Sequence, residues 1–286
     1  RFKRGALVHF AIDPYEVHMT TRLEDSKTIF LPFNKGRDGG SGNPNNPNGY
    51  RTSYLWEQIW QKDSWLEIIG SFIDYQIEKK DPPTPPDERI VFPRYHQLEA
   101  VRKLITASRQ NGTGTNYLIE HSTGSGKSMS IAWLAYKLFS LHDENDKPVF
   151  DNVLVLSDRI VLVNQLGDTI KQFEKTAGIV KKVESGAELA ELLEKYKKII
   201  VSTQQKFPIA SEKISQIKGK NFAVIIDEAH SSQGADGSAG EVREVLNMTA
   251  EVKRESEMED TNKDITDLIE ENMTKRLQSY ENLSYY

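Results

Sequence analysis

The 286-residue chain contains no cysteine, which excludes disulfide bonds and cysteine-ligated metal or iron–sulfur centres. It also lacks any apolar run of membrane-spanning length and any charged-then-apolar signal peptide at its N-terminus. An excess of one charge is missing too: the net charge is −5, so DNA binding would need a local basic surface. We therefore expect an intracellular protein with no membrane partner.

Composition and a proline-rich stretch divide the chain into four parts. Hydrophobic residues make up 37% and charged residues 28%, as in a globular protein of one large or two modest domains. The stretch Asp81–Pro86 holds four prolines and predicts an extended linker at a domain boundary. We expect a β-rich part, a helical connector with this linker, an α/β domain and a charged, helix-prone part, at 1–50, 51–92, 93–250 and 251–286.

A phosphate-binding loop is predicted at His121–Ser128, which reads His-Ser-Thr-Gly-Ser-Gly-Lys-Ser. It lies between a strand signal, Tyr117–Glu120, and a helix signal, Met129–Leu141. In such a loop glycines let backbone N–H groups approach an anion, the helix N-terminus adds its positive end, and Lys127 reaches the β- and γ-phosphates. The strict pattern has glycine where His121 stands. The ATP-binding candidates are Thr123, Gly124, Ser125, Gly126, Lys127 and Ser128.

A second motif follows a hundred residues later. The apolar run Phe222–Ile226 predicts a strand buried on both faces of a parallel sheet, and Asp227-Glu228-Ala229-His230 follows it. Ligands bind at this end of such strands. Asp227 and the Ser128 hydroxyl can hold Mg²⁺, while Glu228 can orient or deprotonate the attacking water. Lys127, Asp227 and Glu228 are therefore the catalytic candidates for ATP hydrolysis.

The same domain alternates strands with helices, which predicts a doubly wound parallel sheet. Its further strand signals are Val153–Leu156, Ile179–Val183 and Ile199–Val201. Arg159, Thr203 and Gln204 follow strand ends, where they would either contact DNA phosphates or belong to ordinary strand-end loops; the neighbouring motor motifs favour phosphate contact.

Other polar and aromatic residues admit two readings each. Gln97 opens a helix upstream of the phosphate loop and would either read the adenine edge through its amide or lie on the helix surface; its position favours adenine. Trp56, Trp60 and Trp65 would form a base-stacking platform or pack against other side chains, and packing is our interpretation. His96 and His121 lack a metal-spaced partner, so neither is predicted to be a ligand.

The N-terminal region reads as β-structure followed by a loop and a helix. Strands are predicted at Ala6–Ile12, Val17–Thr21 and Thr28–Phe33. The segment 34–49, rich in Gly, Asn and Pro, predicts a surface loop with no core of its own. Helical spacing of apolar residues predicts a helix over 53–79.

The two motor motifs, with the Gln97 helix and the segments ending at Arg159 and Gln204, resemble the early motifs of superfamily 2 helicase-type motors. Nearly the whole chain further resembles the restriction (R) subunit of type I restriction–modification enzymes. The segments that carry this second resemblance are Ala6–Phe10, Met19–Thr21, Phe30–Asn34, Tyr54–Glu57, Asp63–Leu66, Asp227–Gln233 and Asn282–Tyr286.

This resemblance implies a RecA-like first motor lobe preceded by the β-rich tail of a nuclease domain and a helical connector. It implies an ATP- and Mg²⁺-dependent, double-stranded DNA translocase and endonuclease, working with methyltransferase (M) and specificity (S) subunits in a prokaryotic cytoplasm. His230 would couple the nucleotide site to a second lobe. The nuclease residues are expected before Arg1 and the second lobe, with its arginine finger, beyond Tyr286. We therefore expect the isolated chain to hydrolyse ATP slowly.

Two other functions compete with this reading. Another superfamily 2 DNA or RNA helicase, or a remodelling ATPase, would use the same nucleotide site on a different substrate. A non-catalytic scaffold would keep nucleotide as a structural ligand. The presence of Lys127, Ser128, Asp227 and Glu228 argues against the scaffold, because a degenerate site usually loses one of these residues.

Overall fold

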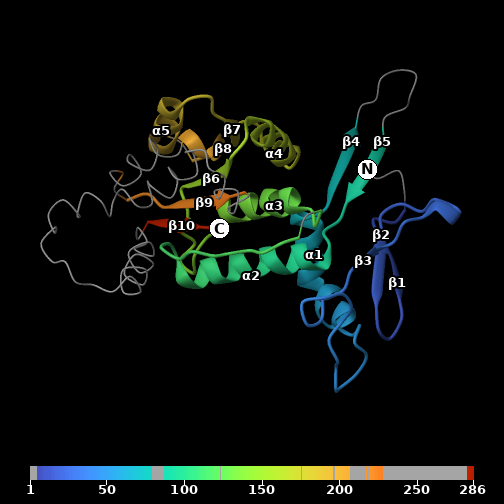
Figure 1. Cartoon of the computed structure of the whole chain (residues 1–286). Helices are drawn as coiled ribbons and strands as arrows, with labels where there is room; N and C mark the ends of the chain where they lie inside the picture. The colour runs from blue at the N-terminus through green and yellow to red at the C-terminus, as the bar shows by residue number, and fades with distance from the viewer. Residues whose placement is uncertain are drawn as a thin grey trace, which may run out of the picture. The chain divides into compact units, whose positions relative to one another are not determined.

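The computed structural model describes residues 5–78, 87–122, 124–174, 176–195, 197–206, 217, 219–227 and 282–286. It divides into two compact units, Arg1–Lys103 and Leu104–Tyr286 (Figure 1), and each is described by itself. The dividing point falls inside helix α2, Tyr95–Asn111.

The boundary expected at Asp81–Pro86 is therefore misplaced, although these residues themselves lie outside the described ones. Strands β4 (Asp74–Glu78) and β5 (Asp87–Val91) flank this stretch and pair antiparallel, from Asp74 opposite Val91 to Glu78 opposite Asp87. The strands on either side of this stretch thus belong to one small sheet in the first unit.

The described residues of the first unit form two small antiparallel sheets, two short helical turns, helix α1 and the start of α2. Strands β1, β2 and β3 form one sheet in that order, and β4 and β5 form the other. The predicted N-terminal strands are confirmed. Part of the predicted helix 53–79 is instead β4, where polar and apolar residues alternate with the period of a strand. The elements are β1 (His9–Ile12), β2 (Val17–Thr20), a 3₁₀ turn (Asp25–Lys27), β3 (Leu31–Pro32), a π-helical turn (Leu55–Ile59) and α1 (Lys62–Ser71).

The tryptophans of this unit pack only in part. Trp60 contacts the Phe10 ring edge-on and Trp56 contacts Tyr50. Yet Trp56 is 40% and Trp60 41% exposed. Trp65 is half-buried and contacts Phe92. The packing interpretation therefore holds in part for all three tryptophans.

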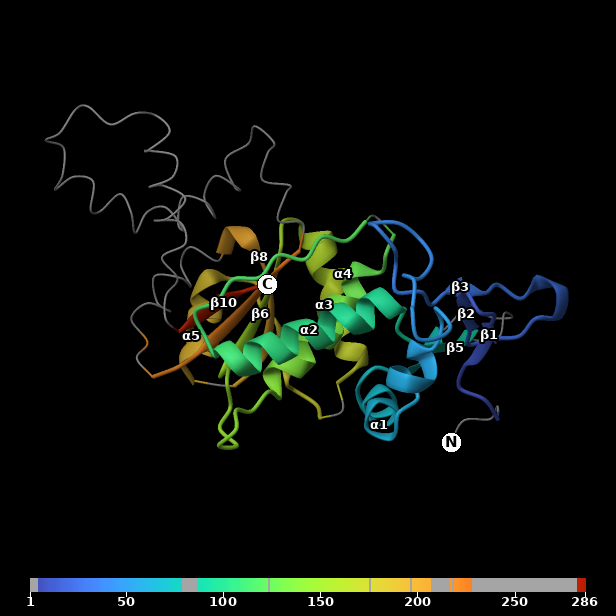
Figure 2. The same cartoon turned by 90° about the horizontal axis from the view of Figure 1, so that it is seen from below.

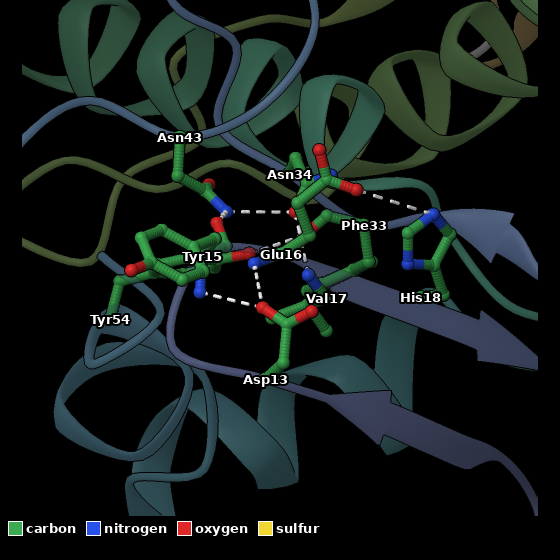
Figure 3. Close-up of polar contacts among 9 residues, drawn as sticks. All are labelled: Asp13, Tyr15, Glu16, Val17, His18, Phe33, Asn34, Asn43 and Tyr54. Carbon is green, nitrogen blue, oxygen red and sulfur yellow. Dashed lines mark hydrogen bonds and ion pairs between the residues drawn. The ribbon is translucent and has the colours of Figure 1, made fainter. Parts of the chain in front are cut away.

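The segment 34–49 is anchored more firmly than a loop with no core of its own would be. Asn43 is 2% exposed and its side chain bridges three parts of the unit (Figure 3). Its Nδ2 donates to the Tyr15 carbonyl at 2.9 Å and to Asn34 Oδ1 at 2.8 Å, and its Oδ1 accepts the Lys35 N–H at 2.8 Å. Asn34 Oδ1 also accepts the Val17 N–H at 2.8 Å. Buried amides thus tie the segment to the start of β2.

The second unit is built on a five-stranded sheet in which all strands are parallel, in the order β10-β9-β6-β8-β7. The predicted α/β doubly wound parallel sheet is confirmed. The C-terminal residues expected to belong to a charged helical segment include strand β10, which pairs with β9. The elements are α3 (Lys127–Phe139), β6 (Asn152–Ser157), α4 (Ile160–Gln172), β7 (Val180–Lys182), α5 (Gly186–Lys195), β8 (Ile199–Thr203), a 3₁₀ turn (Gln204–Lys206), β9 (Phe222–Ile226) and β10 (Leu283–Tyr285).

Helices cover both faces of this sheet, whose central strands β6, β8 and β9 are mostly apolar. All residues of β6 and β8 are buried, as expected for strands covered on both sides. On one face Leu154 and Val224 pack with Leu189 and Leu193 of α5. On the other, α3 and α4 pack against each other and against the sheet (Figure 1). Because helices pack on both faces of the sheet, the strands are held in place, and so are the positions at which they end.

Candidate nucleotide-binding site

The phosphate loop has the backbone conformation that its glycines predict. Gly124 has φ +76° and Gly126 has φ +87°, a region in which residues with a Cβ are strained. Among the described residues other than its chain neighbours, none has an atom within 4 Å of the position that a Cβ on Gly124 would occupy, and both glycines are exposed. The loop closes through the Ser125 N–H, which donates to the Ser122 carbonyl at 3.2 Å. The backbone is thus open to an incoming anion. Thr123 lies outside the described residues.

Helix α3 starts immediately after this loop. Gly126 is its N-cap residue, and its carbonyl accepts the N–H groups of Met129 at 3.1 Å and Ser130 at 3.3 Å. Lys127, half-buried, and Ser128, exposed, form the first turn, where N–H groups and the helix dipole favour negative charge. Further along, Trp133, Ala135 and Leu138 are buried and anchor the helix. The first turn is therefore held in place by the buried part of the helix.

The segment before the loop differs from the prediction. Tyr117–Glu120 is not a regular strand, although the Tyr117 N–H donates to the Tyr285 carbonyl at 2.8 Å. The segment between α2 and α3 runs past β10 in both views (Figures 1 and 2). The Tyr117 ring stacks on Tyr286, with ring centroids 5.1 Å apart. Because β10 has only three residues, it offers little backbone for a longer ladder.

The strand ends of β6, β8 and β9 meet at one edge of the sheet. Leu156 lies opposite Ile226, and Ser157 lies opposite Thr203, so the residues that follow these strands share that edge. Asp227 follows β9, and its N–H donates to the Leu156 carbonyl at 2.9 Å. Helix α3 packs on β6, β8 and β9. The predicted magnesium ligand Asp227 is thereby fixed at a sheet edge, while Glu228 and His230 lie outside the described residues.

The three residues predicted to contact DNA differ sharply in exposure. The Arg159 side chain is 79% exposed and pairs with Asp158 at 3.5 Å. Thr203 is 2% and Gln204 6% exposed, which is at odds with direct contact to DNA in this conformation. The Gln204 Nε2 instead donates to the Asp227 carbonyl at 3.3 Å. Polarity at a strand end did not distinguish a residue that faces solvent from one that faces its neighbouring strand.

Gln97 is neither on the helix surface nor exposed. It is 4% exposed, and its Oε1 accepts the Arg94 N–H at 2.9 Å. Residue 97 is the third of α2 and Arg94 precedes the helix, so this contact is half of a capping box. Only the glutamine half of the capping pattern stands in the sequence, because the cap position is Arg94 and not the serine or threonine that completes the signature.

Sequence reasoning missed the buried hydroxyls at the same sheet edge. The Oγ of Ser157, the Oγ of Ser202 and the Oγ1 of Thr203 are buried and make no hydrogen bond in the part of the chain that the structure describes. Each such group costs about 1–3 kcal/mol when it stays unsatisfied. Polar residues ending otherwise apolar strands were the available signal. Functional edges of enzymes are where such cost is commonly found.

Two searches of the described residues bear on other classes of function. Among them, no three His, Asp or Glu side chains are grouped as a metal-binding cluster would require. None of the helices in the described ranges is both long and apolar enough to cross a membrane.

The family model of the SWI2/SNF2 ATPase matches residues 96–273, which is more than half of the chain and spans both motor motifs. The chain therefore belongs to the SWI2/SNF2 ATPase family, a superfamily 2 helicase-like class. No curated protein matches the sequence.

Two solved structures are similar in part. One, a nuclease-deletion mutant of the Type ISP restriction-modification enzyme LlaGI in complex with a DNA substrate mimic, is 20% identical with a TM-score of 0.35, over 51% of this chain and 13% of that one. The other, the ATP-dependent Type ISP restriction-modification enzyme LlaBIII bound to DNA, is 17% identical with a TM-score of 0.39, over 88% of this chain and 16% of that one. This chain thus spans a small part of either protein, and the assignment rests on the family match.

Proposed function

We propose that this chain carries the ATP-hydrolysing lobe of a double-stranded DNA translocase, the R subunit of a type I restriction–modification enzyme. The observation that supports ATP hydrolysis best is that one SWI2/SNF2 match covers both the open glycine loop at the start of α3 and Asp227 at the sheet edge. The R-subunit part of the proposal rests on the N-terminal and tryptophan-containing segments that resemble that family. Methyltransferase and specificity subunits are the partners it implies.

The residues fit an ATP–magnesium ligand. Gly124 and Gly126 leave the backbone N–H groups accessible, and Lys127 would neutralise charge on the β- and γ-phosphates. A serine hydroxyl and a carboxylate, Ser128 and Asp227, are the oxygen donors that Mg²⁺ takes. When bound, the metal would neutralise charge that develops on the transferred phosphoryl group.

The remaining roles belong to the same proposal. Glu228 would orient the attacking water, and His230 would link the nucleotide site to a second lobe. Gln97 is the candidate for adenine recognition. Arg159, because it is exposed, is the candidate for contact with DNA phosphates, which needs only charge and donors. ATP hydrolysis at this site would drive translocation before cleavage, with the nuclease residues outside this chain.

The test is ATP binding and hydrolysis by the complete protein that contains this chain, with Lys127→Ala. Removing a charge-assisted contact to phosphate should weaken Mg²⁺-dependent binding of a fluorescent ATP analogue about 10- to 100-fold and abolish DNA-stimulated hydrolysis. Lys137→Ala, in the same helix but away from the loop, is the matched control and should retain both. Unchanged ATP turnover in Lys127→Ala would refute the assignment of this loop.

A remodelling or unwinding ATPase is the second candidate, because it would use the same nucleotide site and the SWI2/SNF2 ATPase match begins at residue 96, after the N-terminal segments that carry the R-subunit resemblance. The two differ in what ATP hydrolysis does to DNA. The restriction motor should move along duplex DNA without displacing a strand and should cleave it when translocation stalls. ATP-dependent strand displacement without cleavage would favour the second candidate instead.

A further inference from the structure

The backbone of Asp227 makes hydrogen bonds with residues at the ends of two other strands, β6 and β8. Its N–H donates to the Leu156 carbonyl of β6 at 2.9 Å. Its own carbonyl accepts the Gln204 Nε2 at 3.3 Å. Gln204 directly follows β8, and β6 lies between β8 and β9 in the sheet. The Gln204 side chain therefore reaches across the end of β6 to the end of β9.

The two contacts restrain the backbone of Asp227 on both sides of its Cα. The Leu156 carbonyl holds the N–H on one side, and the Gln204 amide holds the carbonyl on the other. Because the side chain leaves the backbone at this Cα, the restrained backbone fixes the place and direction from which the proposed metal ligand projects. Of the two contacts, only the one from Gln204 comes from a side chain, so a substitution can remove it.

The setting makes the contact specific to Gln204. The residue is 6% exposed, whereas the next one, Gln205, is exposed. In the described part of the chain the nearby buried hydroxyls of Ser157, Ser202 and Thr203 make no hydrogen bond. Gln204 thus supplies a side-chain donor at this edge, and removing it would leave the Asp227 carbonyl without that donor.

We propose that Gln204 is a positioning residue for ATP hydrolysis, which fixes the backbone of Asp227 and does not itself touch nucleotide or DNA. This inference rests on the proposed ATPase function. It replaces the expectation that Gln204 contacts DNA phosphates. ATP binding depends on the phosphate loop, which Gln204 does not contact through any hydrogen bond shown, so its loss should affect turnover and leave nucleotide affinity largely intact.

The experiment uses the complete protein with duplex DNA and compares Gln204→Met, Gln204→Glu and Gln205→Met. Methionine keeps the length but has no donor, and glutamate sets an oxygen against the Asp227 carbonyl. We expect kcat for ATP to fall roughly tenfold in Gln204→Met and further in Gln204→Glu. KM for ATP and DNA affinity should stay within about twofold of the unaltered protein. Gln205→Met should match the unaltered protein throughout.

The outcomes separate this inference from the function on which it rests. If the unaltered protein and Gln205→Met hydrolyse ATP in a Lys127-dependent manner while Gln204→Met keeps full kcat, the positioning role is refuted and the ATPase stands. Weaker DNA binding with full kcat at saturating DNA would return Gln204 to a DNA-contact role. A fall in kcat that matches a fall in the fraction of protein able to bind nucleotide would mean a merely structural effect. Absence of ATPase in the unaltered protein would overturn both proposals.

Discussion

The two compact units are stabilised by different kinds of contact. In the first unit, strands have two to five residues, and the core depends on aromatic rings and buried amides. Phe10, for example, contacts Phe33, Trp60 and Phe92. The second unit buries aliphatic side chains of a regular parallel sheet between helices. The second unit should therefore respond mainly to lost volume, and the first mainly to lost hydrogen bonds.

The largest expected effect is on the aliphatic sheet. Leu154 is fully buried in β6, so Leu154→Ala removes apolar contacts and leaves a cavity, at a cost of about 3 kcal/mol. Hydrogen exchange of peptides from each unit should show loss of protection in the second unit alone. Leu118→Ala, at a residue 89% exposed, is the control and should change stability by less than about 0.5 kcal/mol. Equal loss of protection in both units would mean that they unfold as one.

The corresponding test of the first unit removes a buried amide. Asn43→Ala deletes the group that bridges Tyr15, Asn34 and Lys35, and the groups left behind cost about 2 kcal/mol. We expect a lower urea midpoint and faster exchange in peptides from segment 34–49. Asn45→Ala, at an exposed position of the same segment, should leave both unchanged. If Asn43→Ala also has no effect, the amide network does not stabilise the unit.

This difference also explains how much could be predicted from sequence. The motor domain was predictable because apolar runs such as Val153–Leu156 and Phe222–Ile226 report burial directly, and because the glycines of the phosphate loop need positive φ. The roles of the residues that follow the strand ends were harder to predict. Arg159 and Gln204 read alike in sequence, yet one faces solvent and the other reaches Asp227, because orientation depends on a strand distant in the chain.

The first unit was harder to predict for a physical reason. Its structure depends on individual hydrogen bonds between distant residues, such as Asn43 with Tyr15, which no periodic pattern reports. The prolines near residue 81 predicted a linker, and nothing in their sequence indicated that the strands on either side pair with each other. Strand β10 has only three residues, which is too few for a periodic pattern to place it beside β9.

A smaller effect is expected where a polar contact occurs within the second unit. The Tyr286 hydroxyl and Ser108 Oγ lie 2.6 Å apart and buried, joining the end of β10 to α2, and burial raises the pKa of Tyr286 well above its ordinary value. Tyr286→Phe keeps the ring and removes this hydrogen bond, which should cost about 1 kcal/mol. Urea unfolding measures the change. Tyr117→Phe, which removes a longer and more exposed contact with Asn111, should cost less; the reverse order would contradict the role given to Tyr286.

The smallest expected effect is a pH dependence common to both units. The Asp13 carboxylate accepts the N–H groups of Tyr15 and Glu16, which holds its pKa below the ordinary 3.8; the N–H groups of Lys147 and Asn145 do the same for Asp143. A lowered pKa in the folded state means that the contribution to stability is present above the unfolded pKa, about 3.9, and is lost as pH falls through the folded pKa.

Replacing either aspartate with asparagine keeps a hydrogen-bond acceptor that does not titrate. Asp13→Asn and Asp143→Asn should therefore each lose less stability than the unaltered protein when urea midpoints at neutral and acidic pH are compared. Because Asp13 is exposed and Asp143 is only partly buried, the two changes should be small and similar. A much larger change from Asp13→Asn would mean that the first unit depends on charge at this turn as well as on its buried amides.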